Sequence, residues 1–318
     1  IIMPGLLILA GIMPFCCLSQ NEPDSLLSSS KRSKTVCLTS TAGYATSSYF
    51  LYKNWYSQYE LGRFHFHDDT DNWRSMDKLG HIQATYMQTD LLNHAFRWAG
   101  DDALYQGAVF ALAFQTGIEI MDGFSTAWGF SWADFGSNVA GASLYIVQEK
   151  LWNQQRLTLK YSYYPKTYSS QKNLSENGLF EYNLDQRANT LYGTGLLERA
   201  LKDYNGQTIW LSSNPKDWIK SGKWPDMINV AFGYSTENLF GAKRNSWEIN
   251  NQQISLDAEL YPRSSQFILS LDYRLQGIKT KSRFLKTVFK FMDYIKWPSP
   301  AIEYRSTGEW QFHLLFLN

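Results

Sequence analysis

The chain has 318 residues and a formal net charge of +1, from 30 basic and 29 acidic side chains. This near-neutral balance argues against nucleic-acid binding, because it provides no electrostatic attraction to phosphate. Aromatic residues make up 16% of the chain, with 20 Tyr, 19 Phe and 12 Trp. Tyr and Trp are enriched where proteins meet a membrane interface, so the composition favours a membrane-associated protein.

Residues 1–19 predict an export signal peptide. The apolar run from Leu6 to Met13 is too short to span a bilayer, and Cys16-Cys17-Leu18-Ser19 follows it. Lipid attachment at Cys16 or Cys17 stays open, because neither cysteine follows a regular lipobox. Residues 20–40 are polar and free of pattern, which predicts a flexible tether. The remaining cysteine, Cys37, offers no disulfide framework and no metal-binding cysteine pair.

Residues 41–150 predict a helical domain. Apolar residues recur with helical spacing over 42–59, 76–99, 103–121 and 132–150. Ser131 and Asp134 form a capping box that starts the last of these helices. The third helix is apolar on nearly every side, so we expect it to be buried in the bundle or to dip into a membrane.

Residues 151–318 change to a period of two, which predicts an antiparallel strand-rich domain. Alternating segments cover 156–163, 208–213, 228–235, 246–250, 267–275, 300–306 and 309–317. One face is aliphatic and aromatic, whereas the other carries Arg156, Lys160, Asp272, Arg274, Glu309 and His313. The pattern fits a small outer-membrane β-barrel of about eight strands, and it equally fits a soluble sheet with one solvated face.

Two helices interrupt the strands, at 189–204 and 279–295. The second is basic and amphipathic, and such a helix lies well on an anionic lipid surface. Its membrane-surface residues would be Lys281, Arg283, Lys286 and Lys290. The alternative is a helix that packs on the sheet with solvated lysines. The fold class is therefore α+β, with about four helices followed by the antiparallel domain.

Polar pairs recur on three of the predicted helices. Their spacings of three or four residues place both members on one helix face, and the six residues are Asp77, His81, Glu119, Asp122, Asp134 and Asn138. Isolated charges inside an apolar bundle are costly, so we expect these groups to converge. They form either a polar network that fixes helix register or a divalent-metal site with His81, Glu119, Asp122 and Asp134 as ligands.

The connection before the second helix holds His65, His67, Asp68 and Asp69. It is a second possible set of metal ligands, and the alternative is a solvated loop. The sequence contains no nucleophile elbow, HExxH, phosphate-binding loop or dinucleotide fingerprint. The best-marked enzyme classes are therefore absent.

Four segments resemble the YfiM-like predicted periplasmic lipoproteins: Asp77-Lys78-Leu79-Gly80-His81, Glu119 to Gly123, Gly129 to Phe135 and Asn138 to Ala142. The similarity covers about Met76 to Tyr145, within a helical YfiM-like domain, and the flanks look like extended members of Bacteroidota type. A looser similarity to VanZ-like membrane proteins rests on the same elements. The resemblance implies an envelope location and no settled activity.

Two functions follow from these observations. The first is a non-catalytic envelope protein at the outer membrane, with its helical domain facing the periplasm. It would be an accessory subunit that contacts other outer-membrane proteins, or a component that contacts outer-membrane lipid. The alternative is a metal-dependent hydrolase or transferase that acts on lipid or phosphorylated glycan in the envelope.

Overall fold

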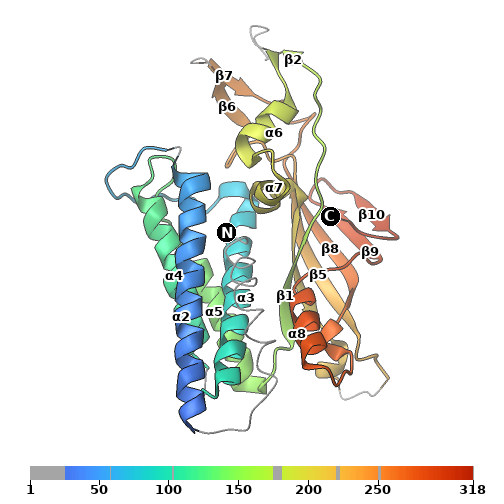
Figure 1. The fold of residues 1–318 in the computed structure, drawn as a ribbon. Helices are drawn as coiled ribbons and strands as arrows, with labels where there is room; N and C mark the ends of the chain where they lie inside the picture. The colour runs from blue at the N-terminus through green and yellow to red at the C-terminus, as the bar shows by residue number, and fades with distance from the viewer. Residues whose placement is uncertain are drawn as a thin grey trace. The chain divides into compact units, whose positions relative to one another are not determined.

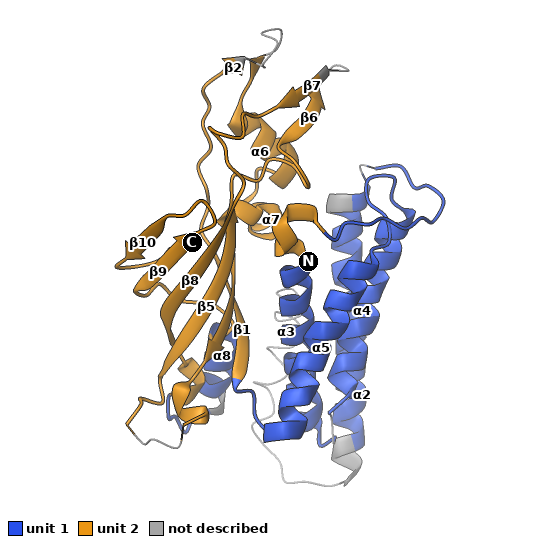
Figure 2. Cartoon of the chain, turned by 180° about the vertical axis from the view of Figure 1, so that it is seen from behind, with its two compact units in different colours: residues 1–70, 78–156, 278–292 blue, residues 71–77, 157–277, 293–318 orange. Residues whose placement is uncertain are grey.

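The computed structural model describes residues 26–57, 59–101, 104–174, 181–219, 223–249 and 252–317. The predicted signal peptide, with Cys16 and Cys17, lies outside these residues. The chain divides into two compact units (Figure 2). The helical unit falls within residues 1–70, 78–156 and 278–292, and the strand-rich unit comprises 71–77, 157–277 and 293–318. Helices precede a six-stranded antiparallel sheet, which confirms the α+β class.

The long helices of the chain are α2 (Leu26–Leu51), α3 (Met76–Ala99), α4 (Gln106–Phe124) and α5 (Trp132–Trp152) (Figure 1). A short π-helical turn, η1 (Tyr52–Tyr56), extends α2. Buried side chains of α2, α3 and α4 form the core of the helical unit: Val36, Tyr44, Leu92, Ala95, Phe96, Ala99, Ala111, Phe114 and Ile118. None of the helices in the described ranges is both long enough and apolar enough to cross a membrane.

Helix α2 begins at Leu26, so residues 26–40 are helical where the sequence predicts a tether. That part of the prediction was wrong. The Thr35 and Thr39 hydroxyls donate to carbonyls one turn earlier, at 2.9 and 2.8 Å, which satisfies two polar groups inside the helix. Val36 is buried in the core. Tertiary packing therefore outweighs the weak helix propensity of a Ser- and Thr-rich segment.

The loop at 60–67 pairs with 123–130. The amide of His65 donates to the carbonyl of Gly123 at 2.9 Å, and the amide of Phe130 donates to the carbonyl of His65 at 2.9 Å. A Cβ at Gly123 would lie 2.3 Å from the Phe64 ring, so only glycine fits there. This pairing holds the loop against the start of α5.

The chain enters α3 through a strained turn, η2 (Asn72–Ser75). Trp73, Arg74 and Ser75 all have positive φ, at 52°, 50° and 63°. Left-handed backbone costs such residues about 1 kcal/mol or more each. The strand-rich unit stabilises it, since the carbonyl of Ala242 accepts from the Trp73 amide at 2.8 Å and Tyr234 Oη donates to the Arg74 carbonyl at 2.7 Å.

The main sheet has the order β1, β4, β5, β8, β9, β10, and every pair in it is antiparallel. Its strands are β1 (Leu157–Tyr163), β4 (Gln207–Ser213), β5 (Ile228–Glu237), β8 (Ser264–Tyr273), β9 (Ala301–Arg305) and β10 (Trp310–His313). Short helical turns η3 (Tyr204–Gly206), η4 (Pro215–Asp217) and η5 (Leu275–Gly277) flank them. The predicted strands at 156–163, 208–213, 228–235 and 267–275 correspond to β1, β4, β5 and β8.

The buried and exposed faces of this sheet have the opposite polarity to those of a typical soluble sheet. The row of paired residues on the inner face is buried and mostly polar or small: Lys160, Trp210, Gly233, Ile268 and Glu303. A row on the other face is exposed and wholly apolar: Leu211, Phe232, Leu269, Ile302 and Phe312. Five side chains pack as the apolar part of the inner face: Trp210, Ala231, Ile268, Ala301 and Phe316.

The outer edge of β1 is occupied by residues 294–296. The Tyr161 amide donates to the Tyr294 carbonyl at 2.8 Å, and the Lys296 amide donates to the Tyr161 carbonyl at 2.9 Å. As far as the structure describes the chain, β1 and β10 are the two ends of an open sheet. Among the described residues the main sheet has six strands in place of the expected seven or eight, because 246–249 pairs in a separate hairpin.

That hairpin consists of β6 (Ser246–Ile249) and β7 (Gln252–Ser255), and a further pair consists of β2 (Asn173–Leu174) and β3 (Glu181–Tyr182). The helix predicted at 189–204 is two helices, α6 (Leu184–Tyr192) and α7 (Leu196–Lys202). Gly193 follows α6 with φ of 77°, a conformation that ends the first helix there.

The predicted basic helix is present as α8 (Arg283–Met292). One of its four proposed membrane-surface residues has a different role. Lys290 Nζ lies 2.8 Å from Asp90 Oδ1 of α3, and both side chains are largely buried. The prediction was wrong for Lys290, because a partner 200 positions away in the sequence binds its ammonium group.

Candidate functional site

The centre of the polar cluster in the helical unit is His81, which is almost fully buried on α3. Its Nδ1 lies 3.1 Å from Oδ1 of Asn138 on α5. The Thr85 hydroxyl, one turn further along α3, donates to the same oxygen at 2.9 Å. The amide oxygen of Asn138 thus joins two positions of α3 to α5.

A lysine next to His81 neutralises part of the cluster. Lys78 Nζ lies 2.7 Å from Asp69 Oδ2 and 2.8 Å from Asp134 Oδ1. Ser131 Oγ donates to Asp69 at 2.5 Å and accepts from the Asp134 amide at 3.0 Å, which is the predicted cap of α5. Burial raises the pKa of Asp69, but side-chain hydrogen bonds with Asp134, Lys78 and Ser131 lower that pKa overall.

Two carboxylates, from Glu119 and Asp134, face His81. Glu119 Oε1 of α4 lies 3.6 Å from His81 Nδ1, and Asp134 Oδ1 lies 3.5 Å from His81 Nε2. One turn before His81 on α3 is Asp77, which accepts a hydrogen bond from Tyr204 Oη at 2.9 Å. Single ligand atoms of Asp77, His81 and Asp134 all lie within 4.8 Å of one another.

Four of the six residues singled out in the sequence are therefore linked in the helical unit: His81, Glu119, Asp134 and Asn138. Asp122 of the same unit instead accepts a hydrogen bond from Tyr56 Oη at 2.7 Å. Burial raises the pKa of Tyr56, and the neighbouring Asp122 and Glu119 raise it further. Asp69 and Lys78 were missed as members of the cluster. Lys78 lies three residues before His81 on α3, and this spacing, which places both side chains on one helix face, could have identified it.

The loop histidines are not gathered into a metal-ligand set in the part of the chain that the structure describes. His65 Nε2 lies 2.8 Å from the Trp128 carbonyl, and Asp68 accepts from the Thr70 hydroxyl at 2.7 Å. His65, His67 and Asp68 are exposed. Asp69 alone of this group joins the cluster.

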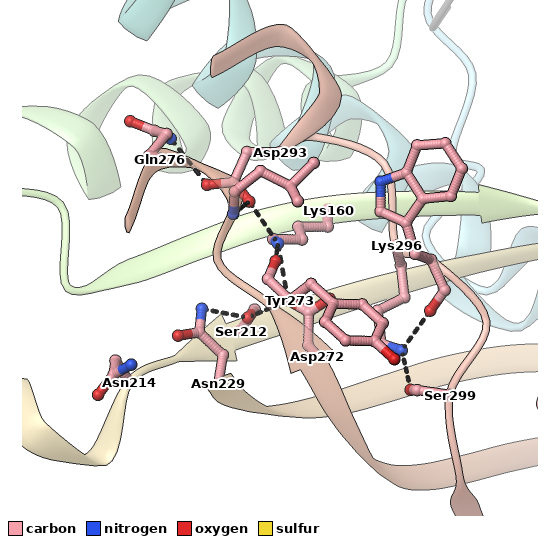
Figure 3. A network of polar contacts seen from close by, with 12 residues as sticks. Lys160, Ser212, Asn214, Asn229, Asp272, Tyr273, Gln276, Asp293, Lys296 and Ser299 are labelled. Atoms are coloured by element: carbon pink, nitrogen blue, oxygen red, sulfur yellow. Dashed lines mark hydrogen bonds and ion pairs between the residues drawn. The ribbon is translucent and has the colours of Figure 1, made fainter. Parts of the chain in front are cut away.

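A second buried polar network lies on the inner face of the sheet (Figure 3). Lys160 Nζ lies 2.7 Å from Asp272 Oδ2 and 2.9 Å from Asp293 Oδ1, and it donates to the Tyr273 carbonyl at 2.8 Å. Ser212 Oγ donates to Asp272 at 2.6 Å. The sequence placed Lys160 and Asp272 on one polar face, but nothing in it indicated Asp293, which follows α8.

Lys296 lies in the same segment as Asp293 and is also buried. Its ammonium donates to Ser299 Oγ at 2.7 Å and to the Trp297 carbonyl at 2.9 Å, and it lies 4.8 Å from the centre of the Trp210 ring. Burial lowers the pKa of Lys296 to about 8. The inner face therefore holds two buried lysines with different partners, since Lys160 contacts both aspartates and Lys296 contacts Ser299, the Trp297 carbonyl and the Trp210 ring.

Comparison with known proteins extends this description. Residues 64–150, which contain α3, α4 and most of α5 with the cluster around His81, match the family model described as "Predicted periplasmic lipoprotein (DUF2279)". Neither the curated proteins nor the solved structures give a match. The family match indicates a protein of the cell envelope. The YfiM-like, Bacteroidota-type and VanZ-like resemblances stay predictions.

Proposed function

We propose that this chain is an outer-membrane-associated envelope protein that contacts lipid through the outward face of its main sheet. The observation that carries the proposal is the reversal of the two faces of that sheet. The inner face carries charged groups beside a small apolar cluster, whereas the described side chains of the outward face on β5, β8, β9 and β10 are all uncharged.

The reversal is clearest along β8. Leu269 is 54% exposed and its neighbour Ile268 is 0% exposed, and the alternation continues so that Phe267, Leu271 and Tyr273 are all exposed. A soluble sheet buries its apolar face, because exposed apolar area costs roughly 25 cal/mol per Å². An apolar exterior around a polar interior is the arrangement of membrane-facing strands.

Aromatic residues follow one row of this face. Strand pairing places Tyr234, Phe267, Tyr304 and Trp310 side by side across β5, β8, β9 and β10. Rings of Tyr and Trp prefer the level of lipid headgroups, with aliphatic side chains beside them in the hydrocarbon. The neighbouring row, with Leu269 and Ile302, supplies that aliphatic band.

The helical unit would then face the periplasm, in agreement with the periplasmic description of the matched family. In this proposal the chain has no catalytic role. It is an accessory subunit of an outer-membrane complex or a component that contacts lipid directly. Closure of the sheet into a barrel is a separate proposal from lipid contact. Closure would require β1 to pair with β10, whereas residues 294–296 already form hydrogen bonds with the outer edge of β1.

Vesicle flotation tests this proposal. The purified full chain is mixed with vesicles of phosphatidylethanolamine and phosphatidylglycerol, with Leu269→Glu/Phe312→Glu as the test variant and Leu260→Glu as the control. Leu260 is 73% exposed and lies outside the main sheet. We expect wild type and control to float with the vesicles, also in high salt, because apolar contact is not screened.

The test variant should remain in the dense fraction, because each carboxylate on a lipid-facing strand opposes insertion, although by less than the roughly 2–4 kcal/mol that Arg or Lys costs at the bilayer midplane. Circular dichroism checks that it keeps its fold. Wild-type protein that stays free of vesicles contradicts the proposal. Equal flotation of a folded Leu269→Glu/Phe312→Glu variant would show that lipid contacts another surface.

The second candidate is a metal-dependent hydrolase or transferase that acts on lipid or phosphorylated glycan in the envelope. The observation that favours it is the His81 cluster, where an imidazole and several carboxylates meet in a buried setting. Release of inorganic phosphate or of a glycan fragment on adding Zn²⁺ or Mn²⁺ to the pure protein would support it. No release from phospholipid or phosphorylated glycan with either ion would oppose it.

A further inference from the structure

The segment Ile278–Met292 collects positive charge. It consists of α8 and the short loop before it, and it carries Lys279, Lys281, Lys286 and Lys290 but no Asp or Glu. The whole chain has a formal net charge of only +1, so the other residues together are net acidic. The cluster is therefore not a consequence of an overall basic composition, and it provides a local field that attracts anions.

The structure gives these lysines two different roles. Lys290 Nζ lies 2.8 Å from Asp90 Oδ1, and this ion pair anchors the end of α8 to α3 within the helical unit. Lys279, Lys281 and Lys286 are exposed, and none of them forms an ion pair with a residue in the described part of the chain. The anchored segment thus presents three ammonium groups to the solvent.

Two exposed apolar side chains lie between these lysines in the sequence. Phe284 is 49% exposed and Leu285 is 39% exposed, both in the first turn of α8. Lysine side chains can follow an apolar surface with their methylene groups and place the ammonium at the level of lipid headgroups. Free phosphate would neutralise the lysines, but it would not cover Phe284 and Leu285. An anionic lipid surface meets both requirements.

The charges at the start of α8 do not stabilise the helix itself. The Leu285 amide donates to Ser282 Oγ at 3.3 Å, and the Lys286 amide donates to the Ser282 carbonyl at 3.1 Å, so the helix begins next to this serine. No acidic residue lies in the first turn. The helix dipole favours acidic side chains at this end and disfavours basic ones. An external anion therefore accounts for Lys281 and Lys286 better than helix stability does.

We propose that residues 279–286 bind the headgroups of anionic phospholipid through Lys279, Lys281 and Lys286, with Phe284 and Leu285 in contact with the lipid interface. The proposal rests on the proposed function in one respect, that the chain lies at a membrane, and it adds the class of lipid and a second contact surface. Each ammonium group near an anionic surface strengthens binding by roughly 5-fold at low salt. Salt screens this contact, so flotation in high salt reports on the sheet alone.

The test variant is Lys281→Gln/Lys286→Gln in the full chain. Glutamine is polar and has a high helix propensity, so the fold should not change. Lys53→Gln/Lys223→Gln is the matched control, because both lysines are exposed, neither forms an ion pair with a described residue, and the loss of charge is the same. Affinity is measured at low salt with vesicles of phosphatidylcholine and with vesicles that also contain phosphatidylglycerol.

Wild type and control should bind the phosphatidylglycerol vesicles about 100-fold more tightly than the neutral vesicles, because three ammonium groups contribute roughly 5-fold each. Lys281→Gln/Lys286→Gln should lose about 25-fold of that preference and keep the wild-type affinity for neutral vesicles. High salt should remove the preference from all three proteins.

Three results would overturn the proposal. Equal affinity of wild type for both kinds of vesicle shows that the segment does not bind anionic lipid. Equal losses in the test and control variants assign the preference to the charge of the whole chain. Wild type that binds neither kind of vesicle opposes this proposal and the proposed function together. The affinity for neutral vesicles tests the sheet and the ratio of the two affinities tests α8, so failure of one proposal is distinguished from failure of the other.

Discussion

Replacement of Lys160 by Met is the sharpest test of the buried network in the strand-rich unit. The Lys160 side chain is fully buried, and it contacts the carboxylates of Asp272 and Asp293 at 2.7 and 2.9 Å. Met has nearly the same length and volume, so packing changes little. The variant leaves two carboxylates in the interior without their shared cation.

Removal of one partner from a buried ion pair costs about 3–5 kcal/mol. Asp293 retains donors in the Leu275 amide and Gln276, at 3.0 and 2.9 Å, and Asp272 retains Ser212. Because these hydrogen bonds remain, the expected loss in the free energy of unfolding is about 3 kcal/mol. Urea unfolding of the full chain, followed by tryptophan fluorescence, measures the free energy of unfolding.

The physical reason for that loss is tested by Lys160→Met/Asp272→Asn/Asp293→Asn, which removes all three charges together. We expect it to be more stable than Lys160→Met, because neutral buried groups carry a smaller desolvation penalty. Lys172→Met is the control. Lys172 pairs with Glu181 at 2.6 Å on the exposed surface, and its loss should not change stability measurably. A triple variant no more stable than Lys160→Met would refute the reasoning.

Three more outcomes follow. Gly141→Ala should destabilise by about 1–3 kcal/mol in urea, since a Cβ there would lie 2.3 Å from a backbone oxygen of α3, whereas Gly136→Ala on α5 has free space and should stabilise by about 0.5–1 kcal/mol. Ser131→Ala should cost about 1–2 kcal/mol by the same assay, because it removes the cap of α5. Lys290, and secondly burial, lower the pKa of His94 from 6.5 to about 4. The folded state therefore binds fewer protons in that window, and stability should fall as the pH drops from 6.5 to 4. The effect should be small, because solvent reaches part of the His94 side chain and screens the Lys290 charge, and His94→Gln should abolish it in unfolding curves at pH 7 and 5.

Local signals account for the elements that the sequence predicted well. The cap at Ser131 and the apolar spacing of α3 locate helix starts, because both act within one or two turns of chain. The alternation of β8 also separated its two faces correctly. It did not show which face is buried, since a period of two is the same for a soluble and a membrane-facing sheet.

The failures concern groups whose partners are distant in the sequence. Lys290 was assigned to a lipid surface because its helix is amphipathic, but Asp90 binds it. Asp122 has the right spacing to join Glu119, but Tyr56 competes for it. Residue spacing predicts which side chains share a helix face, and it does not predict what the opposing helix presents to that face.

The division of the chain also has a consequence for biosynthesis. Helix α8 belongs to the helical unit, although residues 157–277 of the strand-rich unit precede it. The ion pair between Asp90 and Lys290 can therefore form only after nearly the whole polypeptide has been synthesised. Domains generally fold as units during synthesis, in order from the N-terminus. In this chain the helical unit is complete only after the sheet segments have been synthesised. A cut near residue 156 would separate α8 from α2 to α5, and residues 71–77 from the rest of the strand-rich unit.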